Sequence, residues 1–271
     1  EKKNIQGKEA MGGLRFPEAR LSPGQARSYI IVMGIVGEAD KIQSHINKFS
    51  TLSKVKASLE ETKRFWASLA DRAGVRTGDR DFDNWFRWVS IQPVLRSLFG
   101  CSFLPDFDYG KGGRGWRDLW QDCLALMLND AAGMREALVN NFSGVRIDGS
   151  NATIIGKKRG EFIADRNNII RVWMDHGVWP LITLDLYLDK TEDLSILFEE
   201  TTYFRDQHLN RCASVDPEWE VAQGNRLRDK KGRVVKGSIL EHLLVQSLTQ
   251  FFNVGRHNHI RLEGADWNDG L

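Results

Sequence analysis

Chemically active side chains crowd the stretch Glu263–Leu271, which reads EGADWNDGL. Asp266 and Asp269 flank Trp267 and Asn268, and glycines stand on either side. A carboxylic acid in such a loop can donate a proton to a reacting oxygen, and a tryptophan ring can stack on a flat ligand. An ordinary Asx turn is the structural alternative, although it explains a lone Asp-Gly better than two aspartates around Trp-Asn.

A second candidate lies in YGKGGRGWRDLWQDCLALML, residues 109–128, where a glycine-rich loop precedes a predicted helix. The glycines allow the backbone to approach a ligand closely. At roughly 100° per residue, one face of this helix carries Arg117, Asp118, Gln121, Asp122 and Ala125. That face is either a solvated surface or the wall of a polar pocket. The lack of Lys and Glu favours a wall, and the pattern leaves both interpretations open.

The third candidate is Asp175-His176, which stands just ahead of an apolar segment. Pro180 would break a helix interior but is tolerated in a first turn, so we expect a helix to begin near Trp179. The body of that helix is apolar all round, which predicts burial and places Asp175 and His176 just outside its N-terminus. A satisfied core or capping histidine is the structural alternative for His176.

Helical patterns recur from residue 83 onward and strand signals are few, which predicts a mainly α fold of helical hairpins. The expected helices cover residues 83–100, 116–130, 131–142, 179–191, 193–209 and 237–254. If such hairpins close into a barrel, the three candidate loops meet at one mouth. Their carboxylates and guanidinium groups can bind sugar hydroxyls, Trp can stack on a pyranose face, and one carboxylic acid can protonate a glycosidic oxygen.

The N-terminal part of the chain differs in pattern. Residues 26–37, ARSYIIVMGIVG, form a β-branched run between turn residues, which predicts a buried strand. From residue 38 to about residue 72 the pattern is helical, and Ser58 with Glu61 is a capping-box signature. Since the chain has no initial methionine, we expect it to be an interior piece of a larger protein.

Composition narrows the functional classes. The 271 residues carry a net charge of +2, with 41% apolar and 27% charged residues, which argues against a nucleic-acid partner. Cys101, Cys123 and Cys212 lack metal-ligand spacing, so we expect no metal and a reducing, cytoplasmic location. No signal-peptide pattern is present, and the longest apolar stretch, Val178–Leu188, contains Asp185 and is too short to span a membrane.

Two motifs carry a family resemblance. GWRDLWQD, residues 115–122, matches the pattern Gly-aromatic-Arg-Asp-x-x-Gln-Asp, and ADWNDGL, residues 265–271, matches a catalytic loop with Asp-Trp-Asn-Asp-Gly. In these motifs the sequence resembles the inverting glycoside phosphorylases of the cellobiose-phosphorylase type, over roughly Asn84–Leu271. It looks closest to the 1,2-β-oligoglucan phosphorylases, through YGKGGRGWRD, VRIDGSNATIIG and RVWMDHGVWP.

The resemblance implies a fold and a reaction. Residues 1–37 would end an N-terminal β-sandwich domain, residues 38–73 would form linker helices, and residues 74–271 would form the first part of an (α/α) barrel of six hairpins. The reaction would be reversible phosphorolysis of a β-glucan oligosaccharide, indicated to be β-1,2-linked, with inversion to α-glucose 1-phosphate. Inorganic phosphate would be the co-substrate, without any cofactor. The oligomeric state is not fixed, and a homodimer is one option.

The resemblance also assigns residues. Asp269 would be the general acid, and Trp267 would line the subsite for the transferred glucose. Arg117 and Asp118 match residues that bind that sugar. Asp175 and His176 align more loosely with sugar-binding positions, because the family often has Asp-Asp-x-x-Trp there.

The choice of phosphate over water as the nucleophile has a physical basis. An inverting hydrolase needs a second carboxylate, roughly 6.5–9.5 Å from the acid, whereas phosphate brings its own nucleophilic oxygen. No cationic phosphate cradle forms a recognisable motif here, and we expect its residues to follow Leu271. Two alternatives remain open. One is an inverting hydrolase with Asp118 or Asp175 as base, and the other is a non-catalytic carbohydrate-binding fragment.

Overall fold

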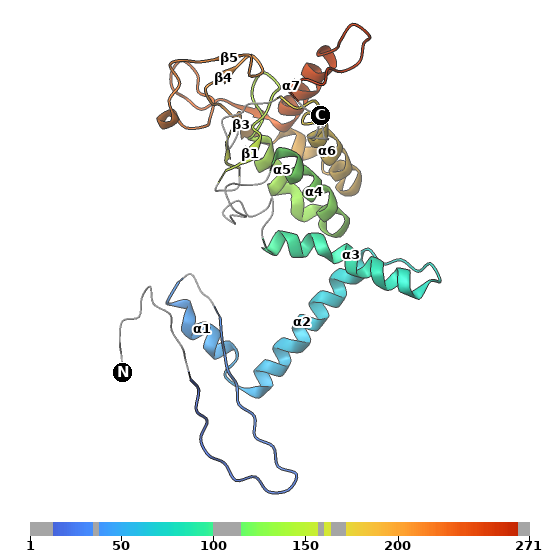
Figure 1. Cartoon of the computed structure of the whole chain (residues 1–271), viewed down its shortest axis with the longest axis vertical. Helices are drawn as coiled ribbons and strands as arrows, with labels where there is room; N and C mark the ends of the chain where they lie inside the picture. Colours follow the sequence, from blue (N-terminus) through green and yellow to red (C-terminus); the bar gives the residue numbers. More distant parts are fainter. Residues whose placement is uncertain (1–12, 35–37, 100–114, 157–159, 164–171, 265–271) are drawn as a thin grey trace. The chain divides into compact units, whose positions relative to one another are not determined.

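The computed structural model describes residues 13–34, 38–99, 115–156, 160–163 and 172–264 (Figure 1). Trp267 and Asp269 therefore lie outside the described residues. The chain divides into two compact units, Glu1–Trp66 and Ala67–Leu271, with the boundary inside helix α2 (Leu52–Arg72). Each unit is described by itself.

The first unit corrects one prediction. Residues 26–34, the described part of the predicted buried strand, have no strand pairing, and Met33 is 95% exposed. The described contacts of this segment with the preceding one include the Phe16 and Tyr29 rings, 4.2 Å apart, and a hydrogen bond from Tyr29 Oη to the Pro17 carbonyl. A β-branched run becomes a strand only where a partner accepts and donates its backbone hydrogen bonds, and the described residues supply none.

Two helices follow this extended segment. Helix α1 (Lys41–Lys48) and α2 confirm the helical pattern predicted after residue 38. The capping box predicted at Ser58 and Glu61 is wrong, because α2 already begins at Leu52. The start of the helix is instead marked by Thr51, whose hydroxyl oxygen accepts a hydrogen bond from the Lys54 N–H at 3.3 Å.

Helices dominate the second unit. They are α3 (Arg80–Phe99), α4 (Trp116–Asp130), α5 (Arg135–Phe142), α6 (Val178–Thr191) and α7 (Ile239–Phe252), with short 3-10 helices at Ala132–Met134, Leu194–Phe198 and Val221–Gln223. The predicted mainly α class is thus confirmed over the described residues, while the six-hairpin barrel and the domain limits stay predictions. Among the described helices, none combines the length and apolar character needed to cross a membrane.

The strands form three separate antiparallel pairs. β1 (Ile154–Ile155) pairs with β2 (Phe162–Ile163), β3 (Glu200–Thr202) with β6 (Lys236–Ser238), and β4 (His208–Leu209) with β5 (Ser214–Val215). The helix predicted over residues 193–209 is therefore wrong. After one 3-10 helix this segment becomes extended, because β6, some 35 residues further on, supplies a backbone partner that a local pattern does not reveal.

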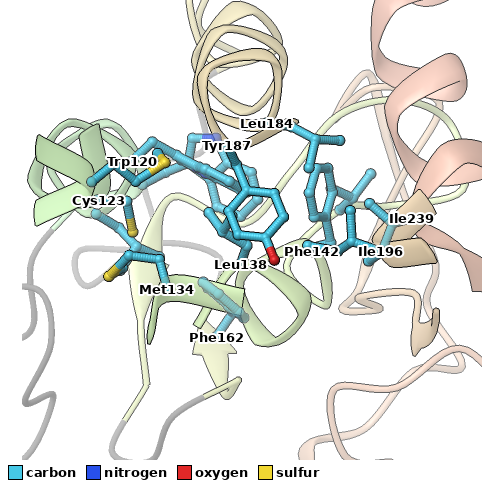
Figure 2. Packing of buried hydrophobic residues seen from close by; sticks show 14 of the residues in the cluster. Trp120, Cys123, Met134, Leu138, Phe142, Phe162, Leu184, Tyr187, Ile196 and Ile239 are labelled. Atoms are coloured by element: carbon cyan, nitrogen blue, oxygen red, sulfur yellow. The ribbon is translucent and has the colours of Figure 1, made fainter. Parts of the chain in front are cut away.

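The core of the second unit joins α4, α5, α6 and α7 (Figure 2). Trp120 packs edge-on against Phe142, with ring centroids 5.0 Å apart, and Leu184 and Tyr187 add the buried side of α6. Trp116, fully buried at the start of α4, donates its indole N–H to the His176 carbonyl at 3.0 Å. The core thereby fixes the N-terminus of α4 against the turn before α6.

Candidate functional site

The first turn of α4 is anchored by its backbone. Gly115 forms an antiparallel bridge with Ile154, and the Trp116 N–H donates to the Thr153 carbonyl at 2.8 Å. Asp118 accepts a hydrogen bond from the Gly115 N–H at 3.2 Å. This predicted sugar-binding residue therefore also caps the helix in which it lies. Neither Arg117 nor Asp118 is exposed, and Asp122 is buried, which favours the pocket wall over the solvated surface.

Arg117 and Asp175, 58 residues apart in the sequence, form an ion pair. Arg117 Nε lies 2.7 Å from Asp175 Oδ2, and the two side chains are 13% and 17% exposed. Trp179, in the first turn of α6, donates its indole N–H to the same carboxylate oxygen at 2.8 Å. The predicted loops before α4 and α6 thus meet through charge and hydrogen bonding, with little access to solvent.

The Trp173 ring contacts two of the predicted site residues, Arg117 and His176. The Arg117 guanidinium carbon is 5.0 Å from the centroid of the Trp173 ring, and the His176 ring stacks on that ring at 5.3 Å with an interplanar angle of 11°. The Trp173 indole N–H is buried and finds no acceptor among the described residues. Sequence reasoning missed this residue, although an aromatic two positions before Asp175 was a visible signal.

His176 is both a core residue and a neighbour of the candidate site. It is 5% exposed, and its Nδ1 lies 3.2 Å from the Asn151 amide nitrogen. Burial, together with the positive charge of Arg117, lowers the pKa of His176 to about 3. The ring is therefore neutral at pH 7, and since the amide nitrogen donates, Nδ1 accepts and the ring proton lies on Nε2.

The segment after α7 returns to this site. Glu263 forms an antiparallel bridge with Trp173, and the Gly264 N–H donates to the Val172 carbonyl at 2.9 Å. Gly264 directly precedes the stretch with Asp266, Trp267 and Asp269, which lies outside the described residues. The structure thus brings together Arg117, Asp175 and His176 and places Glu263 and Gly264, the last described residues, beside Trp173 and Val172, while the positions of Trp267 and Asp269 stay predictions.

A second buried network of charged side chains, Arg146, Asp206 and His208, contacts the candidate site through Asn151. Arg146 donates to both carboxylate oxygens of Asp206, at 3.2 Å and 2.9 Å, and to the carbonyl of Asn151, the residue that contacts His176. Burial alone would raise the pKa of Asp206, but hydrogen bonding and charge from Arg146 lower it. His208 lies 2.8 Å from Asp206 through Nδ1. None of these three residues was predicted, because only the fold brings residues 146 and 206 together.

Comparison with known proteins identifies a relative of low sequence identity. No protein-family model matches the chain. The chain is similar to the cyclic β-(1,2)-glucan synthase NdvB of Rhizobium meliloti (strain 1021), with 22% identity over 253 residues. The similarity covers 92% of this chain, which spans 8% of the length of that protein.

Proposed function

We propose that this chain belongs to a glycosyl-transfer enzyme that acts on β-glucans, and that its reaction is reversible, inverting phosphorolysis of a β-1,2-linked oligoglucan. The observation that carries the proposal is the Arg117–Asp175 pair against Trp173, beside the chain that leads into the Asp-Trp-Asn-Asp stretch. Similarity over nearly the whole chain to a protein named for β-(1,2)-glucan synthesis supports the substrate class.

In the proposed reaction Asp269 donates a proton to the glycosidic oxygen as the bond from that oxygen to C1 breaks. An oxygen of inorganic phosphate attacks C1 from the opposite face, which gives α-glucose 1-phosphate and a glucan shortened by one unit. In this proposal residues 74–271 form part of an (α/α) barrel whose mouth holds the site. Linker helices at residues 38–73 and the end of a β-sandwich at residues 1–37 precede it.

Sugar binding is assigned to charged and aromatic side chains. Arg117, Asp118 and Trp267 bind the transferred glucose, with Asp175 and His176 beside them. The indole N–H of Trp173, which has no acceptor among the described residues, adds a buried donor for a sugar oxygen. Asp175 is a poor candidate for a hydrolytic base, since Arg117 and Trp179 already occupy its carboxylate oxygens.

A second candidate function comes from the name of the relative. A synthase extends a glucan, so the same acid could assist transfer of a glucosyl unit to a glucan hydroxyl instead of phosphate. This alternative keeps the roles of Asp269 and the sugar-binding residues and changes only the acceptor.

The test uses the complete enzyme and short β-1,2-glucans, with and without inorganic phosphate, and follows the products by NMR. We expect α-glucose 1-phosphate, formed only when phosphate is present. Longer glucans formed without phosphate would favour glucosyl transfer, and free glucose released equally well without phosphate would favour a hydrolase. Turnover of cellobiose but not of sophorose would refute the β-1,2 linkage, and sugar binding without any turnover would support the binding fragment.

The same assay tests the general acid. Asp269→Asn removes the transferable proton but keeps the size of the side chain, so the rate should fall roughly 10²-fold or more while sugar binding persists. Asp185→Asn is the matched control, because Asp185 is exposed on α6. Near-normal turnover of the Asp269 variant would refute the assignment.

A further inference from the structure

The turn that connects β4 to β5 has an uncommon backbone conformation. Asn210, Arg211 and Cys212 have φ values of 54°, 54° and 65°, so three successive non-glycine residues lie in the left-handed region. Each such residue costs on the order of 1–3 kcal/mol and persists only where the surroundings enforce it. Arg211, the central residue of the turn, holds it in place through hydrogen bonds to Asp148 and Glu263.

Arg211 links two other parts of the second unit. Its backbone N–H donates to Asp148 Oδ2 at 2.7 Å, and Asp148 is itself held by the Ser150 N–H and hydroxyl. Its guanidinium Nη2 donates to both carboxylate oxygens of Glu263, at 2.7 Å and 2.8 Å. The two side chains of this pair are only 20% and 15% exposed, so solvent screens their attraction weakly.

Glu263 is the point where the last described segment meets the candidate site. It has φ 58°, another left-handed non-glycine conformation, and it bridges with Trp173. The Gly264 N–H bonds to the Val172 carbonyl, and the chain continues directly into Ala265–Leu271. A displacement at Glu263 therefore disturbs both its bridge with Trp173 and the hydrogen bond from Gly264, the last described residue before Ala265–Leu271.

We propose that Arg211 is a positioning residue, which fixes Glu263 against Trp173 and so sets where the segment that carries Asp269 begins. This inference rests on the proposed function in its catalytic consequence. Its structural part, the clamp of residues 263–264 on residues 172–173, is independent of the reaction. Arg211 touches no reacting atom and acts through Glu263.

The structural part is tested by hydrogen exchange and mass spectrometry of the full-length protein with Arg211→Ala. Loss of the clamp should raise amide exchange at residues 261–264 and 172–176, while exchange in α4 stays slow and reports that the core is folded. Arg233→Ala is the matched control, since Arg233 also pairs with a carboxylate, that of Asp229, but on an exposed loop. Unchanged exchange at both segments in Arg211→Ala would overturn the proposal.

The catalytic part is tested by kinetics in the same proteins. Misplacement of the acid should lower kcat for glucan phosphorolysis roughly 10-fold or more with little change in KM, because geometry and not sugar binding is lost. Arg211→Lys should recover part of kcat. The double variant Arg211→Ala/Glu263→Ala should be no worse than either single variant, since both remove one interaction. Additive losses, or an equal rise in KM, would contradict the assignment.

Three further outcomes separate the possible failures. If Arg211→Ala does not fold, Glu263→Gln removes the charge at constant size and must then show the same exchange and kinetic changes for the proposal to hold. If exchange rises at both segments but the unmodified enzyme shows no phosphorolysis, the clamp is supported and the proposed function fails. If phosphorolysis is normal in the unmodified enzyme and in every clamp variant, the proposed function stands and the positioning role fails.

Discussion

At the scale of single residues, two buried histidines with a lowered pKa, His176 and His242, make stability depend on pH. The folded His176 has a pKa near 3 instead of 6.5, because burial and Arg117 disfavour its charged form. Between these pH values the unfolded chain binds a proton that the folded chain does not, so the free energy of unfolding falls as the pH falls. One such site contributes a slope of up to about 1.4 kcal/mol per pH unit between these values, and this slope fades as the pH rises past 6.5.

We expect His176→Asn to make the free energy of unfolding depend less steeply on pH, because one fewer group binds a proton on unfolding. The Asn side-chain oxygen can still accept from the Asn151 amide, and it does not titrate. Urea unfolding between pH 7 and about pH 5.5, where ordinary carboxylates stay almost fully ionised, measures the slope. His242, whose pKa burial also lowers, should supply a remaining slope. His45→Asn, on the exposed face of α1, is the control, and an unchanged slope in His176→Asn would contradict the prediction.

At the scale of elements, α7 has a complete N-terminal capping box. Ser238 accepts from the Glu241 N–H at 3.2 Å, and Glu241 accepts from the Ser238 N–H at 2.6 Å. Ser238→Ala leaves one of these donors unpaired and should lower the free energy of unfolding by about 1 kcal/mol. Ser247→Ala, inside the same helix, should leave stability equal or slightly higher, because alanine has the greater helix propensity. Denaturant unfolding compares the two, and equal effects would show that the cap is not stabilising.

At the scale of the molecule, the second unit exposes an apolar stripe. Leu244, Leu248, Phe251 and Phe252 lie on one face of α7, and the two phenylalanines are 71% and 73% exposed. Contiguous exposed apolar surface of this kind binds hydrophobic dyes and promotes association. The 271-residue chain should therefore raise the fluorescence of anilinonaphthalene sulfonate, and Phe251→Ser/Phe252→Ser should reduce that signal without loss of helix content. Val221→Ser, at an exposed site outside α7 in the 3-10 helix Val221–Gln223, should not reduce it.

Several features of this protein could be read from the sequence. Helix α4 covers the predicted residues 116–130, α6 begins one residue before the predicted Trp179, and α7 lies within the predicted residues 237–254. Pro180 and the periodic apolar residues act within a few positions, so the sequence contains the whole signal. The residue types at Arg117, Asp175 and His176 marked these positions as candidates, and the structure brings the three side chains together around Trp173, while their function stays a prediction.

Tertiary structure alone decided the rest. The extended conformation of residues 200–202 depends on pairing with β6, and the apolar run at residues 26–34 finds no strand partner among the described residues. The Arg117–Asp175, Arg146–Asp206 and Arg211–Glu263 pairs each join residues more than 50 positions apart. Such pairs depend on the core of α4, α5, α6 and α7, which holds the loops together, because charge attraction falls off with distance and leaves no local signal along the chain.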